Sequence, residues 1–185
     1  MDPKIEPFSK MPHIGPENIE SRTGRLTALK SAEATGLISG KYLFASGDVL
    51  YSKIRPYLQK AALPNFSGIC SADMYALHPQ SRLTREFLFC WLLSEPFTAQ
   101  VVSHQSRTGI PKVNRQQLNS TLMAVPPLAE QHSIASYLLS VDQSLTVSQA
   151  RVRVLQILFQ SLLHHLMTGK LRVHDLPLAE PAGSH

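Results

Sequence analysis

Long apolar runs are missing from this 185-residue sequence. No stretch reaches the roughly 18 apolar residues that a membrane-spanning helix needs, so we expect no contact with a membrane. The N-terminus also lacks a basic segment followed by an apolar one, which is the pattern of a secretory signal. These two absences predict a cytoplasmic protein.

Cysteine is scarce as well. Only Cys70 and Cys90 are present, and their separation does not match the spacing of a metal site. Both lie among apolar residues, so we expect buried thiols in a reducing compartment.

The common signatures of catalysis are absent too. Residues 36–42 resemble a phosphate-binding loop, but they have three residues between the glycines and no Ser or Thr after the lysine, which favours a turn. The acid-x-Lys triplet of many metal-dependent nucleases occurs only as Asp2-Pro3-Lys4, near the terminus. No Gly-x-Gly cluster could cradle S-adenosylmethionine, and the eight histidines show no ligand spacing. We expect no catalytic residue, no metal site and no cofactor in this chain.

The segment from Val125 to Gly169 is the most informative part that is present. Pro126 and Pro127 cannot lie inside a helix but can precede one, and the next forty or so residues contain neither Gly nor Pro. Apolar residues then recur at alternating spacings of four and three, as a coiled-coil seam requires. Ser148 is the one polar residue in this stripe, and the apolar seam positions are Ile134, Leu138, Val141, Leu145, Val152, Leu155, Phe159, Leu162 and Leu166.

These features predict a helix about 60 Å long that ends at Gly169 in a left-handed conformation. The alternative is a core helix of a helical bundle, but a small domain could not cover that length. A rod that needs a partner is the better interpretation.

The net charge of +5 lies in the first part of the chain. Residues 1–127 hold fourteen Lys or Arg against nine Asp or Glu, and residues 128–185 hold four against four. A basic domain joined to a neutral apolar rod indicates polyanion binding at one end and protein contact at the other. Strand candidates lie at residues 49–54, 60–63, 69–77 and 122–125, and helix candidates at 84–93 and 95–102. Together they predict an α/β or α+β domain over residues 1–125.

Two turn-rich loops of this domain combine cationic and hydrogen-bonding side chains. In the first, Lys53 and Arg55 share one face of a segment that we expect to be extended, because a proline follows Arg55. From the second loop we single out Arg107, Lys112, Asn114 and Arg115. Arg and Lys can bind guanine edges or phosphates, and Asn can pair with adenine. A solvated rim is the alternative interpretation for each residue.

Several segments resemble, in this order, the specificity subunits of type I restriction-modification systems. They are residues 14–19 (IGPENI), 47–57 (GDVLYSKIRPY), 71–73 (SAD), 108–114 (TGIPKVN), 126–131 (PPLAEQ) and 166–173 (LMTGKLRV). The PPLAEQ hinge followed by a long heptad helix is the most specific of these features.

The resemblance implies a DNA target recognition domain over residues 1–125, a spacer and dimerisation helix over 126–170, and a tail over 171–185. In that family, spacers pack antiparallel as a coiled coil and hold two recognition domains on a bipartite DNA target. Modification subunits methylate adenine with S-adenosylmethionine, and restriction subunits translocate and cut with ATP and Mg²⁺. The implied partners are double-stranded DNA and these subunits, and the specificity subunit performs neither reaction.

The sequence departs from the family in holding one recognition domain and one spacer, and in lacking the segment that usually precedes Ile14. A half-subunit that works as a homodimer, or pairs with another half, is our first hypothesis; a homodimer would read a palindromic, interrupted site. The alternative is a truncated remnant that dimerises or docks on modification subunits without reading DNA. A standalone nuclease is the third hypothesis, and it would need an acidic metal cluster that the sequence does not show.

Overall fold

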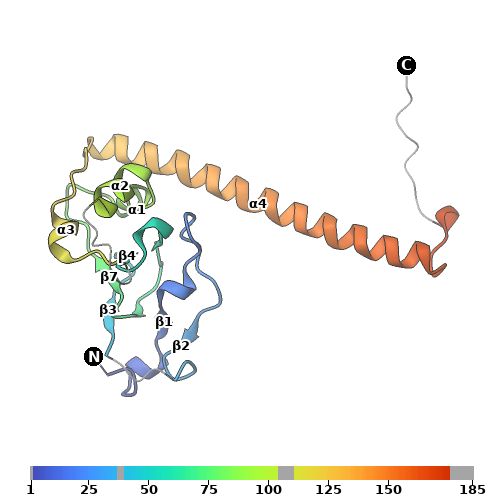
Figure 1. Cartoon of the computed structure of the whole chain (residues 1–185), viewed down its shortest axis with the longest axis horizontal. Helices are drawn as coiled ribbons and strands as arrows, with labels where there is room; N and C mark the ends of the chain where they lie inside the picture. Colours follow the sequence, from blue (N-terminus) through green and yellow to red (C-terminus); the bar gives the residue numbers. More distant parts are fainter. Residues whose placement is uncertain (1, 37–39, 104–110, 176–185) are drawn as a thin grey trace. The chain divides into compact units, whose positions relative to one another are not determined.

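The computed structural model describes residues 2–36, 40–103 and 111–175. By internal contacts the chain divides into two compact units, Met1–Leu139 (unit 1) and Ser140–His185 (unit 2). The described strands all lie in unit 1, and the long helix α4 (Leu128–Met167) begins in unit 1 and continues into unit 2 (Figure 1). The prediction of an α+β domain followed by a long C-terminal helix is confirmed.

Two small sheets form the centre of unit 1. In the first, with order β2-β1-β6-β3, the strands are β1 (Pro12–Ile14), β2 (Lys30–Ser31), β3 (Tyr42–Phe44) and β6 (Gly68–Cys70). In the second, with order β5-β4-β7, they are β4 (Val49–Ser52), β5 (Ala61–Ala62) and β7 (Met74–Leu77). Of these pairs, β1 with β6 is parallel and the others are antiparallel.

Strand β4 lies between two hydrophobic clusters. Successive side chains of a strand point to opposite faces. Val49 and Tyr51 therefore join a cluster with helices α1 (Arg85–Leu92) and α2 (Glu95–Val102), in which the rings of Tyr51 and Phe97 meet edge to face at 5.3 Å. Leu50 joins the other cluster, around the first sheet. Both faces of β4 are buried, so its position is fixed from both sides.

Side-chain caps fix where the helices of unit 1 begin. Thr84, Ser94 and Asn114 each accept a hydrogen bond from the backbone N–H three residues later, at the starts of α1, α2 and α3 (Arg115–Asn119). Such caps satisfy N–H groups that have no partner within the helix. The helices predicted at 84–93 and 95–102 are confirmed. Single 3-10 turns occur at Phe8–Lys10, Pro16–Asn18, Pro56–Leu58 and Val173–Asp175.

Three expectations about strands are wrong. The strand expected over 49–54 ends at Ser52, and the one expected over 69–77 is two strands in different sheets. Residues 122–125 form no strand. The amide of Gln100 accepts from the N–H of Leu122 at 2.8 Å and donates to its carbonyl at 3.0 Å, so a side chain takes the place of a neighbouring strand.

Helix α4 begins directly after Pro126 and Pro127, as predicted. It ends at Met167, and Gly169 adopts the left-handed conformation that was expected, with φ of +70°. Among the described residues, no helix combines the length and apolar character needed to cross a membrane.

Candidate nucleic-acid interface

The two loops that the sequence singles out are joined in the structure. The N–H of Arg55 donates to the carbonyl of Pro111 at 2.8 Å, and the N–H of Val113 donates to the carbonyl of Lys53 at 2.7 Å. An isolated antiparallel bridge at the middle of these two segments completes the pairing. Segments more than fifty residues apart in sequence therefore form one edge of unit 1. We call the set Lys53, Arg55, Lys112, Asn114 and Arg115 the recognition edge.

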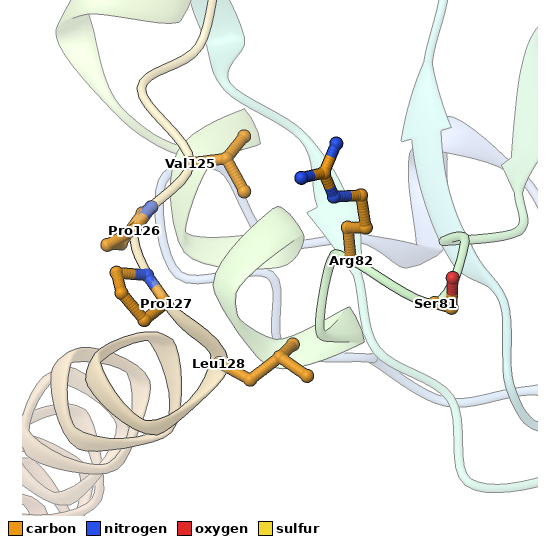
Figure 2. A pocket seen from close by; sticks show the side chains of 6 residues that line it. All are labelled: Ser81, Arg82, Val125, Pro126, Pro127 and Leu128. Atoms are coloured by element: carbon orange, nitrogen blue, oxygen red, sulfur yellow. The ribbon is translucent and has the colours of Figure 1, made fainter.

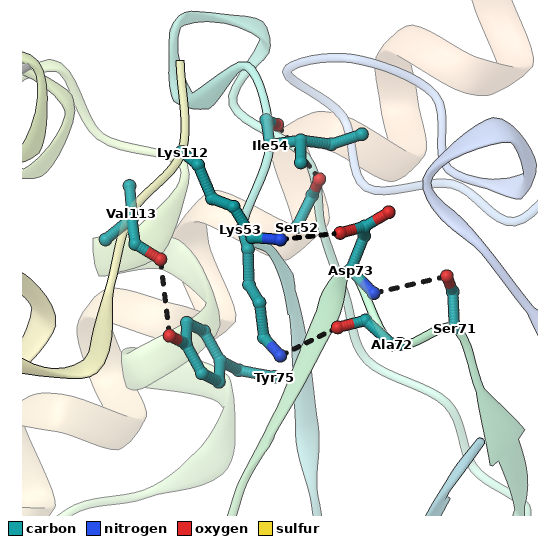
Figure 3. A network of polar contacts seen from close by, with 9 residues as sticks. All are labelled: Ser52, Lys53, Ile54, Ser71, Ala72, Asp73, Tyr75, Lys112 and Val113. Carbon is teal, nitrogen blue, oxygen red and sulfur yellow. Dashed lines mark hydrogen bonds and ion pairs between the residues drawn. The ribbon is translucent and has the colours of Figure 1, made fainter. Parts of the chain in front are cut away.

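The ammonium group of Lys53 is bound within the chain. Its Nζ donates to the carbonyl of Ala72 at 2.8 Å and lies 4.4 Å from the ring centre of Tyr75 (Figure 3). It also lies 5.1 Å from the ring centre of Tyr42. Burial lowers the pKa of Lys53, and the nearby charge of Lys112 lowers it further. Lys53 therefore links the turn after β6 to the end of β4, and its charge is less available to a ligand.

Lys112 lies opposite an acidic side chain. Its Nζ is 3.1 Å from Oδ1 of Asp73, and the two side chains are 56% and 43% exposed (Figure 3). Ion pairs this exposed contribute about 0–1 kcal/mol. Lys112 can therefore exchange Asp73 for a phosphate or a base edge at little cost.

Arg55 does not have the extended backbone that we expected. Its φ and ψ are 50° and 58°, in the left-handed region, and its carbonyl accepts the N–H of Leu58 at 2.9 Å. The chain turns here into the 3-10 turn Pro56–Leu58, so alternation along an extended strand does not apply to Lys53 and Arg55. The Arg55 side chain is nevertheless exposed beside the paired segments.

The remaining members of the edge lie at the start of α3. Asn114 uses its Oδ1 to accept the N–H of Gln117 at 2.8 Å, while Gln117 accepts the N–H of Asn114 at 2.9 Å. The amide oxygen of Asn114 therefore caps the helix. Arg115 is exposed, and its charge contributes to the lowered pKa of Lys53. Arg107, the sixth predicted contact, lies outside the described residues.

Three residues of this region were missed by sequence reasoning: Tyr42, Asp73 and Tyr75. The hydroxyl of Tyr75 donates to the carbonyl of Val113 at 3.2 Å, and Tyr42 is 50% exposed. Asp73 could have been found from the sequence, because residues 71–73 are one of the segments that carry the family resemblance. No signal places Tyr42 beside Lys53, because β3 and β4 belong to different sheets.

The expected seam of α4 is largely open to solvent in the single chain. Its members Leu138, Val141, Leu145, Val152, Leu155 and Phe159 are 52% to 62% exposed. Ile134, Leu162 and Leu166 are partly buried. Within unit 2, a shallow hollow of about 290 Å³ is lined by Val152, Leu155, Phe159 and two glutamines. Contiguous exposed apolar surface of this kind marks an interaction site.

A pocket of about 570 Å³ lies in unit 1 at the start of α4. Figure 2 shows Arg82 and Ser81 on one side and the segment from Val125 to Leu128 on the other. Among the residues that the structure describes, its lining holds one cation and no carboxylate, and so no acid–base pair. In the parts of the chain that the structure describes, no three His, Cys, Asp or Glu side chains lie together where they could hold a metal ion.

Comparison with known proteins gives consistent matches. The family "Type I restriction modification DNA specificity domain" matches residues 10–155. The chain is 37% identical over 166 residues to the type I restriction enzyme EcoDI specificity subunit of Escherichia coli, covering 86% of the chain and 36% of that protein. It is 26% identical over 95 residues to the MjaVIII specificity subunit of Methanocaldococcus jannaschii, covering 51% of the chain and 22% of that protein.

Solved structures agree. The HsdS subunit from Thermoanaerobacter tengcongensis superposes with a TM-score of 0.69 at 25% identity, over 98% of this chain and 47% of that one. A chain from a study of assembly of the type I restriction-modification system superposes with a TM-score of 0.64 at 27% identity, over 100% of this chain and 47% of that one. The chain thus spans less than half the length of these relatives. It belongs to the family of type I restriction-modification DNA specificity domains.

Proposed function

We propose that this chain is a DNA sequence-specificity module that directs adenine methylation and restriction by the partner subunits of a type I complex. The observation that carries the proposal is the pairing of residues 53–55 with 111–113, which gathers the recognition edge on a basic domain of a DNA specificity family. Arg55 and Arg115 are exposed and can reach bases, while Lys112 can exchange Asp73 for DNA.

Catalysis belongs, in this proposal, to other subunits. S-adenosylmethionine would bind to the modification subunits, and ATP and Mg²⁺ to the restriction subunits. The chain contributes DNA contacts and protein contacts only. The complex would act in the cytoplasm, on the DNA of the cell.

A second spacer would cover the seam of α4. Two such helices packed antiparallel would bury the exposed apolar residues of each. The second helix would come from another copy of the chain or from another half-subunit. Paired spacers would hold two recognition domains on a bipartite site.

Modification subunits would use a different part of α4. Val147, Val154 and Ile157 are 58%, 63% and 65% exposed and lie off the seam, so a two-stranded coil would leave them uncovered. Their exposure supports a further protein contact on this helix.

Co-expression with the modification subunit of the host, followed by single-molecule sequencing of methylated DNA, tests the proposal. We expect a bipartite adenine-methylation motif that disappears when this chain is omitted. A palindromic motif would identify a homodimer, and an asymmetric motif would identify a different second half. A folded protein that produces no motif would contradict the proposal and identify a docking remnant. Mg²⁺-dependent cleavage by the chain alone would identify a nuclease.

A further inference from the structure

The side chain of Gln131 is fully buried at the start of α4, with 0% of the residue exposed. Its Nε2 donates to the carbonyl of Arg82 at 2.9 Å and to that of Pro126 at 2.8 Å. Its Oε1 accepts the N–H of Thr84 at 2.9 Å. One amide thus bonds three backbone groups from two separate segments.

These bonds join the start of α4 to the start of α1. Thr84 is the cap of α1, and Pro126 belongs to the hinge before α4. Arg82 and Pro126 face each other across the pocket in Figure 2, so the amide ties together the two sides of that pocket. All four residues belong to unit 1. Without the amide, the carbonyls of Arg82 and Pro126 and the N–H of Thr84 would lose these part-buried hydrogen bonds, which costs stability.

Gln131 is also the first residue of a docking stripe that differs from the seam. Ala135 is 2% exposed, and Leu139 packs against the cluster around α1, α2 and β4. Gln131, Ala135 and Leu139 follow one another at intervals of four and lie on one side of the helix. The seam residues Leu138 and Val141 are exposed instead. The first three turns of α4 are therefore held at one rotation about the helix axis.

We propose that Gln131 is a positioning residue that fixes the rotation of α4 where it leaves the recognition domain, and so selects the gap between the two halves of the DNA target. The inference rests on the proposed function. B-DNA makes a full turn in about 10–10.5 base pairs, so each added base pair turns the second half-site by about 35°. We call the three hydrogen bonds of Gln131 the clamp. If the clamp allows α4 no rotation, the protein binds DNA targets with one gap length. If the clamp is weakened, the protein also binds targets whose gap is one base pair longer or shorter.

Selection from a library of random DNA duplexes by the purified full chain tests this inference. For the natural sequence we expect two half-sites at a single gap. Gln131→Met has a similar length but can neither donate to the two carbonyls nor accept from Thr84. In this variant the half-sites should be unchanged, and the share of duplexes whose gap differs by one base pair should rise about tenfold, the factor that corresponds to about 1.4 kcal/mol.

Two further variants complete the experiment. Gln143→Met changes an exposed glutamine of the same helix and should keep the single gap. Gln131→Asn keeps the amide but is one methylene shorter, so it should give a smaller spread of gaps and serves where Gln131→Met fails to fold. Hydrogen exchange at the Thr84 amide, which should be faster in both Gln131 variants, reports that the clamp is open.

The outcomes separate the two proposals. An unchanged single gap in a Gln131 variant whose Thr84 amide exchanges faster would overturn the inference and leave the proposed function in place. Loss of half-site preference in that variant would also overturn it, because Gln131 would then support the recognition edge itself. If the natural sequence selects no motif, the proposed function is wrong, and the inference that rests on it is wrong as well.

Discussion

At the scale of single residues, two glycines with left-handed backbones differ in what surrounds them. Gly24 has φ of +71°, and a Cβ there would lie 2.5 Å from the carbonyl oxygen of Ala61 and 2.6 Å from the ring of Phe89. Gly36 has φ of +62°, and no atom of the described residues lies within 4 Å of a Cβ there. An alanine at Gly36 therefore measures the cost of the left-handed backbone alone, whereas an alanine at Gly24 adds the cost of a steric clash.

We predict that Gly36→Ala lowers the free energy of unfolding by about 1–2 kcal/mol, the cost of a left-handed non-glycine residue. Gly24→Ala should lower it by about 1–3 kcal/mol more, because the methyl group must displace backbone and a buried ring. Urea unfolding of both variants measures the difference. Equal losses would show that the loop at Gly24 can move away from the methyl group.

His13 on β1 is the buried titratable group of the first sheet. The residue is 4% exposed, and its Nε2 has no hydrogen-bond partner among the described residues. Its pKa is lowered from the usual 6.5, first by burial and then by the charge of Lys41. Protonation of His13 is thus less favourable in the folded protein than in the unfolded chain.

We therefore predict that acid destabilises the fold through His13. Below pH 6.5 the unfolded chain takes up a proton that the folded protein does not, so the free energy of unfolding falls as the pH drops towards the lowered pKa. Each unit of pKa shift corresponds to about 1.4 kcal/mol. Urea unfolding at pH 5 and pH 7 should show a smaller difference in His13→Phe than in the natural sequence, and an equal difference would assign the pH dependence to other groups.

At the scale of elements, helices were more predictable than strands. The two helices at residues 84–93 and 95–102 and the stop at Gly169 depend on local signals, and each is where it was predicted. The described strands are two to four residues long, too short to show a clear alternation of polar and apolar residues. Where they end depends on hydrogen-bond partners that are distant in the sequence. Gln100, which satisfies the backbone of Leu122, is such a partner, and no local pattern could reveal it.

The same limit applies to the recognition edge. Its basic residues could be chosen from the sequence because they lie in turn-rich loops. Their pairing could not, because it depends on the bridge between residues 53–55 and 111–113. The binding of Lys53 by Ala72 and two tyrosines likewise arises only once three strands have come together.

For α4 we predict that Leu155→Asp abolishes self-association. Leu155 is 54% exposed in the single chain and would be buried in a paired seam, where an unpaired carboxylate is strongly unfavourable. Gln143→Asp adds the same charge away from the seam and should leave association intact. Sedimentation of both variants tests this prediction. An intact dimer of Leu155→Asp would show that the seam does not include Leu155.

At the scale of the whole molecule, the positive charge and the apolar rod are separated along the sequence. Residues 1–127 carry a balance of +5 and residues 128–185 a balance of zero. Binding to DNA releases counterions in proportion to the phosphates that are neutralised, which makes affinity depend on salt. The salt dependence of DNA binding should therefore arise from unit 1.

We predict that Arg55→Ala weakens binding to the selected duplex by about 1–3 kcal/mol and relaxes specificity at one base pair, as loss of a base contact does. Lys10→Ala, which removes an exposed lysine paired with Glu6, should leave specificity unchanged. Fluorescence anisotropy over a range of salt concentrations distinguishes the effects. Uniform weakening on all sequences, with a salt slope smaller by about one, would show that Arg55 binds a phosphate instead.

The assignment of the first three turns of α4 to unit 1 has a consequence for recombination between relatives. A crossover at Pro126–Pro127 would join the rest of unit 1 to residues 131, 135 and 139 of another gene, so the bonds of Gln131 to Arg82 and Thr84 would have to form between unrelated segments. A crossover after Leu139 would transfer these residues as one inherited block. Exchange of target specificity between genes, in nature or by design, should therefore succeed more often at residue 140 than at the proline hinge.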